Sequence, residues 1–381
     1  MFEFGEEEVQ AAAQVMRQGR LFRYLEGYES ETAKFEQSWS DLIGVKHSIL
    51  VNSGTSALIT ALRGVDLMPG DEVIIPAYTF VATAVAIISL GAVPIVANID
   101  RSLTIEPSDI ASRITERTRA IVAVHMCGYP CDMHAILAVA RQNDLAVIED
   151  ACQAAGGTYR GARLGSLGDA AAFSFNYFKT ISSGEGGVVV TSHEKVFERA
   201  LIYHDSGCAL FGRNGRLLTM PVFSGQNYRL SEICSAVLNV QIGRLDDILG
   251  NLRLNKAKIN ELGPWYNMKS SPCHDELGEC GTTLSWICKD YSYAKRMVDI
   301  LTNAGFDCGI PFDDDRHVYT HWRPMWENEI SISTRILENE QNLSLEPSIN
   351  ILKSTVQIFN GTNWTDERLH SLNEIREQCG T

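Results

Sequence analysis

The sequence predicts an α/β protein, in which a large three-layer domain with a mainly parallel sheet precedes a smaller C-terminal domain. The chain has 381 residues, of which 45% are hydrophobic and 21% charged, so it can form a large core. Short apolar runs alternate with helical patterns between Ser48 and Thr191, and this texture changes after about Gly250. We therefore expect the large domain, with an N-terminal helix, over residues 1–250 and the small domain over residues 251–381.

Short apolar runs are the candidate strands of the large domain. They are Ser48–Asn52, Glu72–Pro76, Val93–Ala97, Ala120–His125, Leu145–Asp150, Ala170–Phe175 and Val188–Thr191. Several of them are apolar throughout rather than alternating, which is typical of strands covered by helices on both faces. This pattern predicts a mainly parallel sheet between two layers of helices.

Amphipathic segments between these runs are the candidate helices. They span Thr55–Arg63, Thr79–Leu90 and Asp132–Asn143. Gly64 and Gly91 stand where helix ends are expected. Near the C-terminus, Thr365 is a candidate N-cap followed by acidic residues, so we expect a surface helix between Trp364 and Gln378.

The charge balance and the apolar segments exclude several classes of protein. Lys and Arg total 33 against 47 Asp and Glu, a formal net charge of -14, which repels nucleic acid and anionic lipid. The longest apolar stretch, Phe80–Ala97, is interrupted by polar residues, so it predicts a helix and a strand rather than a membrane span. The acidic N-terminus lacks the pattern of a signal peptide, so we expect a cytoplasmic protein.

The cysteines indicate reduced thiols rather than a disulfide framework. They are scattered from Cys127 to Cys379 in a long chain without an export signal. Cys127, Cys131 and His134 have a spacing that could suggest zinc, but no second pair nearby completes four ligands. We therefore expect no metal site.

Several familiar catalytic motifs are missing from the sequence. There is no phosphate-binding G-x-x-x-x-G-K-[ST] loop and no G-x-G-x-x-G between a strand and a helix, which argues against an ordinary kinase or Rossmann dehydrogenase. The G-x-S-x-G and H-E-x-x-H motifs are also missing.

The first feature that could carry chemistry is Val51–Ala57, a strand end followed by a small-residue turn that opens a helix. The free N–H groups of Gly54, Thr55 and Ser56 would point outward at the positive end of the helix dipole, and that geometry binds a phosphate. An N-capped helix after a tight turn explains the same residues without a ligand.

The second feature is Ala146–Asp150, an apolar strand that ends in acid at the carboxyl edge of the sheet, where α/β folds bind ligands. The Asp150 carboxylate could hold a ribose, a magnesium ion or a protonated pyridine nitrogen, or it could be a solvated strand end. Gln153 follows one helical turn later and can present its amide to the same ligand.

The third feature is Phe173–Gly187, in which Lys179 stands among apolar and aromatic neighbours before a glycine-rich segment. Burying an ammonium is costly unless the charge is paired or neutralised. A lysine that forms a Schiff base avoids this cost and gains a function. The alternative is a lysine that reaches water from a loop.

Together the three features fit one cofactor, pyridoxal 5'-phosphate (PLP). This cofactor needs an anion site for its phosphate, a carboxylate for its ring nitrogen and an amine for its aldehyde. Phe80, just after a candidate strand, is the candidate for stacking on its ring.

In the order and spacing of its motifs, the chain resembles the sugar aminotransferases of the DegT/DnrJ/EryC1/StrS family. The resemblance rests on Ser53–Leu58, Gly70–Pro76, Gly91–Pro94, Glu149–Ala154, Gly165–Asp169, Phe173–Phe175, Lys179 with Gly184–Gly187, and Asn227–Arg229. It implies the fold type I (aspartate aminotransferase-like) architecture with a small α+β domain, and a homodimer that shares its active site.

The resemblance also implies roles for the residues singled out above. Lys179 is the Schiff-base lysine, Asp150 is the partner of the pyridine nitrogen, and Gln153 lies beside the ring hydroxyl. The implied phosphate contacts are Gly54, Thr55, Ser56 and Ser174, with Asn227 from the other subunit. The start of a helix near Ser231 would also explain a polar residue at position 227.

A closer likeness is to the branch of the family that makes 8-amino-3,8-dideoxy-manno-octulosonate. It rests on Leu21–Tyr24, His125–Gly128, Glu149–Gly157, Lys179–Ile181, Gly184–Gly187 and the region of Trp322. Val318–Pro324 and His204–Gly207, which are expected to touch the sugar, depart from the pattern. The candidate substrate residues are Arg23, Tyr24, Arg229, Arg316, His321 and Arg323. The last three could bind a carboxylate or phosphate, or could be rim residues of a flexible loop.

These observations predict a PLP-dependent transaminase that moves an amino group from an amino acid, with glutamate as the expected donor, to a carbonyl carbon of a sugar. An eight-carbon sugar acid or octose is the first substrate hypothesis, and a nucleotide-linked keto-hexose is the second. A sensor that binds the cofactor without turnover, and an α/β enzyme that uses Asp150 on a ribose or metal, are the alternatives from other classes. The dehydratases of the family replace the lysine with histidine, whereas Lys179 is present here.

Overall fold

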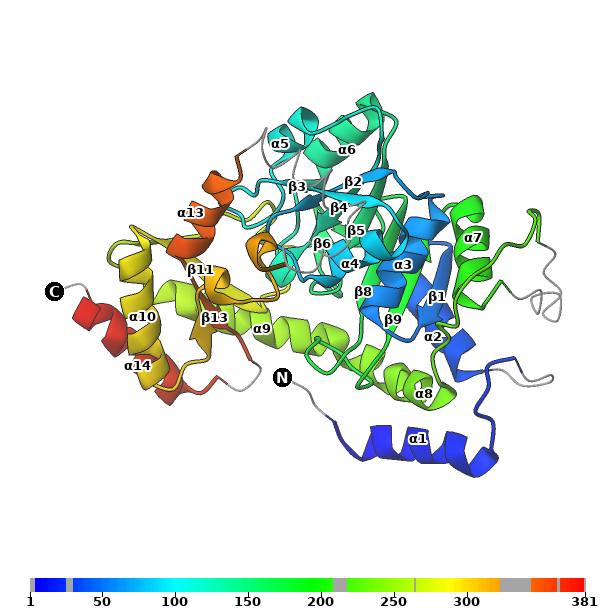
Figure 1. Cartoon of the computed structure of the whole chain (residues 1–381). Helices are drawn as coiled ribbons and strands as arrows, with labels where there is room; N and C mark the ends of the chain where they lie inside the picture. Colours follow the sequence, from blue (N-terminus) through cyan, green and yellow to red (C-terminus); the bar gives the residue numbers. More distant parts are fainter. Residues whose placement is uncertain are drawn as a thin grey trace.

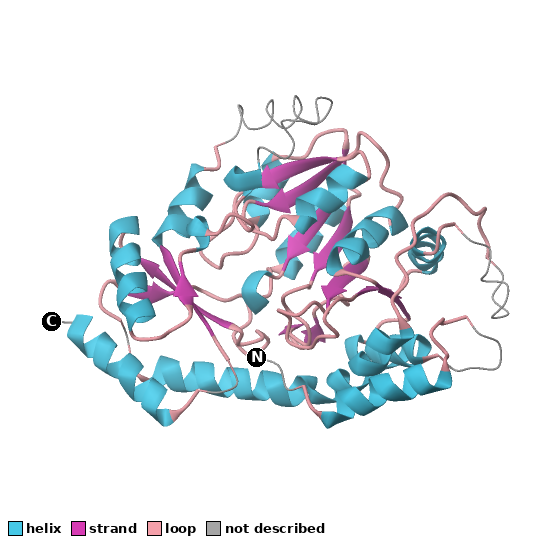
Figure 2. Cartoon of the chain, turned by 60° about the horizontal axis from the view of Figure 1, so that its bottom comes forward, coloured by secondary structure: helices cyan, strands magenta, loops and turns pink. Residues whose placement is uncertain are grey.

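The computed structural model describes residues 4–24, 30–207, 218–263, 265–322, 344–361 and 364–379, and two sheets organise them (Figure 1). Figure 2 shows the strands in two separate groups with helices around them. A short pair, β6 (Thr158–Tyr159) with β7 (Ala162–Arg163), stands apart from both sheets.

The larger sheet has seven strands in the order β1-β9-β8-β5-β4-β2-β3. They are β1 (His47–Val51), β2 (Glu72–Pro76), β3 (Val93–Ala97), β4 (Thr118–Val124), β5 (Ala146–Asp150), β8 (Ala170–Ser174) and β9 (Gly187–Thr191). β9 is antiparallel to both of its neighbours, and the other adjacent strands are parallel. Each predicted strand is present, and the prediction of a mainly parallel sheet is confirmed.

Helices cover this sheet so closely that β2, β3, β8 and β9 are buried along their whole length. The helices of this part are α2 (Glu31–Ile43), α3 (Gly54–Gly64), α4 (Ala82–Ser89), α5 (Pro107–Ser112), α6 (Met133–Gln142) and α7 (Glu194–His204). The predicted helix from Thr79 begins instead at Ala82, because the backbone of residues 77–81 pairs with that of residues 316–319.

The smaller sheet has the order β10-β11-β13-β12 and is antiparallel. Its strands are β10 (Met268–Ser270), β11 (Thr283–Cys288), β12 (Cys308–Gly309) and β13 (Thr355–Phe359), accompanied by the helices α10 (Tyr291–Asn303), α13 (Glu346–Ser354) and α14 (Asp366–Cys379). The predicted C-terminal helix is therefore present, and Thr365 Oγ1 accepts the N–H of Arg368 at 3.2 Å, as expected of an N-cap.

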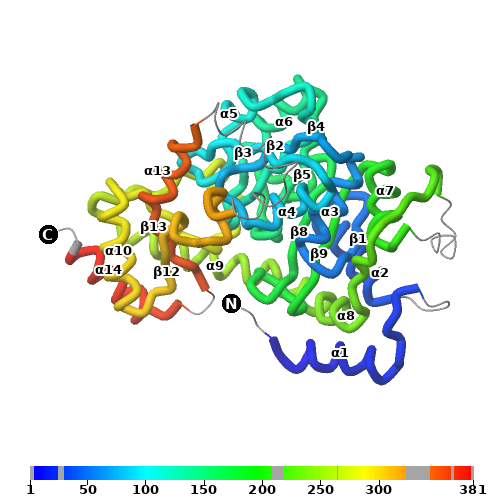
Figure 3. Tube along the Cα trace, viewed as in Figure 1, coloured from blue at the N-terminus to red at the C-terminus, as the bar shows by residue number. Residues whose placement is uncertain are grey.

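Two further helices, α1 (Glu6–Gln18) and α8 (Glu232–Gln241), pack on each other and lie below the larger sheet in the view of Figure 3. A third, the long α9 (Leu245–Glu261), follows α8 toward the smaller sheet. No helix within the described ranges has both the length and the apolar character needed to cross a membrane.

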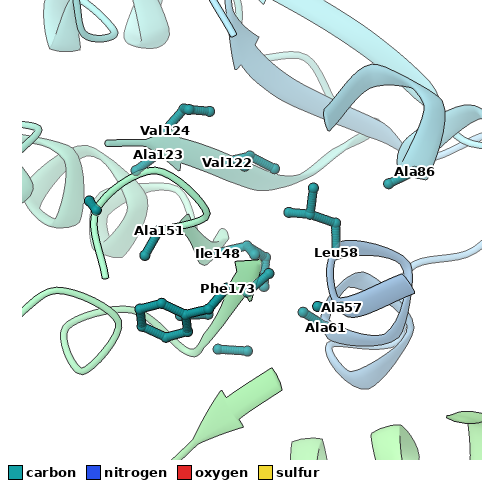
Figure 4. Close-up of a cluster of buried hydrophobic side chains, with 14 of the residues drawn as sticks. Ala57, Leu58, Ala61, Ala86, Val122, Ala123, Val124, Ile148, Ala151 and Phe173 are labelled. Atoms are coloured by element: carbon teal, nitrogen blue, oxygen red, sulfur yellow. The ribbon is translucent and has the colours of Figure 1, made fainter. Parts of the chain in front are cut away.

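Small side chains of α3 let this helix lie close to the larger sheet (Figure 4). Ala57 and Leu58 are buried beside Val122 and Ile148 of the strands. Full burial of an aliphatic side chain of this size contributes about 1.5–3 kcal/mol, so this contact holds α3 firmly against the sheet.

The buried apolar side chains form two clusters, and α9 contributes to both of them. Leu252 belongs to the larger cluster and Ile259 to the smaller. The predicted boundary at residue 250 falls inside this helix. The division into two domains stays a prediction.

Candidate active site

Polar residues gather at the carboxyl edge of the larger sheet, where β5 ends at Asp150 and β8 ends at Ser174. Gly54, the first residue of α3, lies against this edge. A Cβ atom on Gly54 would lie 2.7 Å from Cβ of Ser174 and 3.2 Å from Sγ of Cys152. Only a glycine allows this approach, so Gly54, Cys152 and Ser174 form a tight cradle at the amino end of the helix.

The amino end of α3 supplies backbone donors to this cradle. Oγ of Ser53 accepts the N–H of Ser56 at 3.0 Å, and Oγ of Ser56 donates to Oδ1 of Asn52 at 2.7 Å. The expectation of a free N–H at Ser56 is therefore wrong, because the helix cap uses it. The N–H groups of Gly54 and Thr55 belong to the first turn, where they have no partner within the helix and lie at the positive end of its dipole.

Asp150 is a carboxylate that is 5% exposed. Its Oδ2 accepts a hydrogen bond from Oγ1 of Thr83 at 2.8 Å, and its Oδ1 accepts one from the N–H of Cys152 at 3.1 Å. Donors on both oxygens fix the carboxylate and offset part of the cost of burying its charge. Thr83 was not predicted, because its only signal in the sequence is a hydroxyl in the mostly apolar helix α4, and this does not identify Asp150 as its partner.

Gln153 faces the segment that follows β4. Its Oε1 accepts the N–H of Cys127 at 3.0 Å. Cys127 has a left-handed backbone with φ of 56°, which is unfavourable for a residue with a side chain. Oγ1 of Thr282 donates to its carbonyl at 2.7 Å, so the strained peptide is held on both sides.

Lys179 is half-buried in the turn after β8, where its N–H donates to the carbonyl of Asn176 at 3.0 Å. Burial raises the pKa of the Cys127 and Cys152 thiols, and the positive charge of Lys179 opposes this increase at both of them. The Asp150 carboxylate raises the pKa of Cys152 further. The charges of the lysine and the carboxylate act on the same thiol, and Lys179 follows the end of β8 that borders Gly54, so both groups belong to this edge of the sheet.

Phe80 lies at the surface near these groups with 39% of its area exposed. Its ring centroid is 5.4 Å from that of His317, a contact produced by the pairing of residues 77–81 with residues 316–319. Nδ1 of His317 lies 3.0 Å from Oδ1 of Asp314. Hydrogen bonds from His317 and Arg316 hold the pKa of Asp314 well below its usual range. His317 was not predicted, because no sequence pattern pairs segments so far apart in the chain.

Three of the predicted substrate residues make contacts with other residues of the same chain. Arg23 donates to the two carboxylate oxygens of Glu36 at 2.9 and 2.8 Å, and its side chain is 8% exposed. Its guanidinium lies 5.0 Å from the ring centroid of Tyr24, which is itself buried. Arg229 forms an ion pair with Asp205. Both arginines are thus neutralised by carboxylates of the same chain, and their substrate roles stay predictions.

The other predicted residues of this kind lie nearer the surface. The side chain of Arg316 is 67% exposed and pairs with Asp314 at 3.3 Å, while Nδ1 of His321 lies 3.2 Å from the carbonyl oxygen of Asp314. Asn227, the predicted phosphate ligand of the other subunit, is exposed. Arg323 lies outside the described residues.

Comparison with known proteins gives a consistent set of relatives. The DegT/DnrJ/EryC1/StrS aminotransferase family matches residues 3–351. The chain is 39% identical over 237 residues to the GDP-perosamine synthase of Caulobacter vibrioides, covering 62% of this chain and 61% of that protein, which is less than two thirds of its length. It is 34% identical over 305 residues to the L-glutamine:2-deoxy-scyllo-inosose aminotransferase of Streptomyces lividus, covering 78% of this chain and 70% of that protein.

Solved structures agree with this result. DesV of S. venezuelae has a TM-score of 0.83 and 28% sequence identity, covering 98% of this chain and 95% of that one. The predicted fold type I architecture and the predicted dependence on PLP are confirmed, and the predicted class of enzyme is that of the matching family. The relatives do not single out the octulosonate-forming branch. The chain belongs to the DegT/DnrJ/EryC1/StrS aminotransferase family.

Proposed function

We propose that the protein is an aminotransferase that moves the amino group of an amino acid to the keto carbon of a nucleotide-linked hexose. The observation that carries this proposal is the shared sheet edge at which the cradle, the buried Asp150 carboxylate and the Lys179 amine occur together. Perosamine synthases among the relatives favour a nucleotide-linked keto-hexose over the eight-carbon sugar acid that was the first substrate hypothesis.

The cradle has the chemistry that the phosphate of PLP requires. The N–H groups of Gly54 and Thr55 and the hydroxyl of Ser174 would hold the phosphate at the positive end of α3. Ser56 would support this end of the helix through its bonds to Ser53 and Asn52. A side chain at position 54 would collide with Ser174 and Cys152 and so disturb the cradle.

The neighbouring groups match the ring of the cofactor. Asp150, fixed by the Thr83 hydroxyl, would hold the protonated ring nitrogen, and the Gln153 amide would lie beside the ring hydroxyl. The exposed ring of Phe80 would cover one face. When bound, PLP supplies an electron-withdrawing ring that stabilises negative charge on the reacting carbon of the substrate.

Lys179 has two tasks in this proposal. Its Nζ would hold the cofactor until the amino-acid donor arrives, and the free amine would then take the proton from the Cα atom of the donor as a general base.

We also propose a homodimer in which each subunit completes the active site of the other. Support comes from exposed groups beside the site, namely Asn227 together with Tyr177 and Phe178, which are 63% and 72% exposed. Aromatic side chains are enriched in protein interfaces. Mixing Lys179→Ala chains with Asn227→Ala chains is expected to restore part of the activity, whereas a fully active monomer would refute the shared site.

Mass spectrometry of the reaction products tests the activity. The protein is incubated with glutamate or glutamine and a panel of GDP-linked keto-hexoses and eight-carbon keto and aldehydo sugar acids, and in the reverse direction with GDP-perosamine and 2-oxoglutarate. We expect amino transfer with a nucleotide-linked sugar. Transfer only to the eight-carbon acids would overturn the substrate proposal, and PLP binding without any amino transfer would favour a sensor.

A further inference from the structure

A buried hydrogen-bond network joins the smaller sheet to the active site. Its centre is the amide of Gln357 on β13, which is 3% exposed. Oε1 of this amide accepts the hydroxyl of Tyr78 at 3.0 Å, and Nε2 donates to Sγ of Cys127 at 3.5 Å and to Oγ of Ser285 at 3.2 Å. The oxygen and the nitrogen of the amide therefore both have buried partners, which fixes its orientation.

Cys127 is the first connection between this network and the cofactor site. Its N–H is the donor to Oε1 of Gln153, and its left-handed backbone persists only if the surroundings hold it. The contacts that hold it come from the region of the smaller sheet, since Thr282 bonds its carbonyl and Gln357 bonds its sulfur. The direction of the N–H toward Gln153 thus depends on them.

Tyr78 is the second connection, and it is 3% exposed. It stands two residues before Phe80 in the segment that would cover the cofactor ring. The residue between them, Thr79, lies with its Oγ1 2.7 Å from that of Thr83, which in turn donates to Asp150 at 2.8 Å. Displacement of the Tyr78 ring would therefore move two groups: Phe80, which would cover one face of the cofactor, and Thr83, which bonds the carboxylate expected at the ring nitrogen of the cofactor.

We propose that Gln357 is a positioning residue, which sets the places of Phe80 and Gln153 around the cofactor through Tyr78 and Cys127. This inference rests on the proposed function, because the cofactor roles of Phe80 and Gln153 are assigned there. The position suits such a role, because β13 is paired on both sides, with β11 and with β12. A central strand gives the amide a rigid base.

Two substitutions and one control test the proposal. Gln357→Leu removes the amide, and Tyr78→Phe removes a single hydroxyl while leaving the ring, so it keeps the test decisive if the first variant fails to fold. Asn360→Leu is the matched control, because Asn360 is also a buried amide near this sheet and donates to the carbonyls of Leu252 and Gly281 at 2.7 Å each.

Hydrogen–deuterium exchange is measured on the full chain with and without PLP, and PLP affinity is measured by titration of the cofactor-free protein. Gln357→Leu is expected to speed exchange about tenfold in residues 77–83 and 125–129 and to weaken PLP binding by a similar factor, as for a lost buried hydrogen bond. Tyr78→Phe is expected to act on residues 77–83 and, because its hydroxyl lies 3.6 Å from Sγ of Cys127, on residues 125–129 as well. Asn360→Leu should leave residues 77–83 unchanged. Residues 125–129 are not compared for this control, because the N–H of Asn360 bonds the carbonyl of Thr282, which holds Cys127.

Different results separate this inference from the proposed function. Exchange and PLP affinity within twofold of the wild type in Gln357→Leu, or in Tyr78→Phe where the first variant is unfolded, would overturn the positioning role. Equal effects in Asn360→Leu would do the same, since they indicate a general loss of stability. A wild-type protein that does not bind PLP would refute the proposed function, while the exchange data would still report on the network.

Discussion

Replacing Thr83 by valine is expected to lower turnover at least tenfold while the fold stays intact. Valine has the shape of threonine without the hydroxyl, so Oδ2 of Asp150 loses its donor at 2.8 Å while Oδ1 keeps the N–H of Cys152 at 3.1 Å. A hydrogen bond to a charged group contributes about 1.5–3 kcal/mol. If this amount acts fully on the transition state, the rate falls about 10- to 150-fold.

The assay is a single turnover of the PLP-loaded protein with glutamate, followed by the release of 2-oxoglutarate. Thr83→Ser is the matched control, because it retains the hydroxyl and should keep most of the wild-type rate. Thermal unfolding of each variant shows whether the fold is preserved. A folded Thr83→Val protein with the wild-type rate would refute the idea that this hydrogen bond supports Asp150.

Three further predictions concern charge at the site and elsewhere. Asp150→Asn should retain PLP more fully than it retains turnover, because an amide can bond the ring nitrogen but cannot keep it protonated; equal turnover would count against this role. Arg316→Ala should raise the Michaelis constant for an anionic sugar and leave that for glutamate unchanged. If the variant and the wild type have the same Michaelis constant for the sugar, Arg316 does not take part in substrate recognition. Burial, with the positive charge of Arg23 adding to it, lowers the pKa of His204 to about 3. As the pH falls below about 6.5, the histidine of the unfolded chain binds a proton while the buried histidine of the folded chain stays neutral until about pH 3. The free energy of unfolding therefore decreases between pH 6.5 and 3, by about 2 kcal/mol at pH 5. In urea unfolding, the free energy of unfolding should decrease less between pH 7 and pH 5 for His204→Asn than for the wild type. Equal decreases in the two proteins would contradict this role of His204.

The strands could be predicted because helices cover both faces of the sheet and leave continuous apolar runs in the sequence. The start of α4 could not, since the backbone of residues 77–81 pairs with a segment far away in the chain. Gly64 was predicted as a helix stop, and α3 does end there, but without the left-handed backbone that favours glycine at a helix end. A Cβ there would lie 3.0 Å from Cγ1 of Val196, so the need for glycine comes from the packing of α3 against α7.

The residues of the site divide in the same way, into those with a local pattern and those that depend on contacts between distant segments. Asp150, Lys179 and the start of α3 belong to local motifs at strand ends, and each could be found from its own segment. Thr83 and Gln357 could not be found in this way, because their importance comes from partners brought close only by the fold. Contacts between distant segments leave no spacing pattern in one sequence.

Borohydride reduction of the PLP-loaded protein, followed by peptide mapping with mass spectrometry, tests the central claim most directly. That claim is that the residues around Asp150 hold PLP with Lys179 as the attached amine. We expect the reduced cofactor on the peptide that contains Lys179, and none on the Lys179→Ala protein. A colourless protein without a reducible adduct, or a cofactor fixed at the wild-type level to another lysine, would contradict the claim.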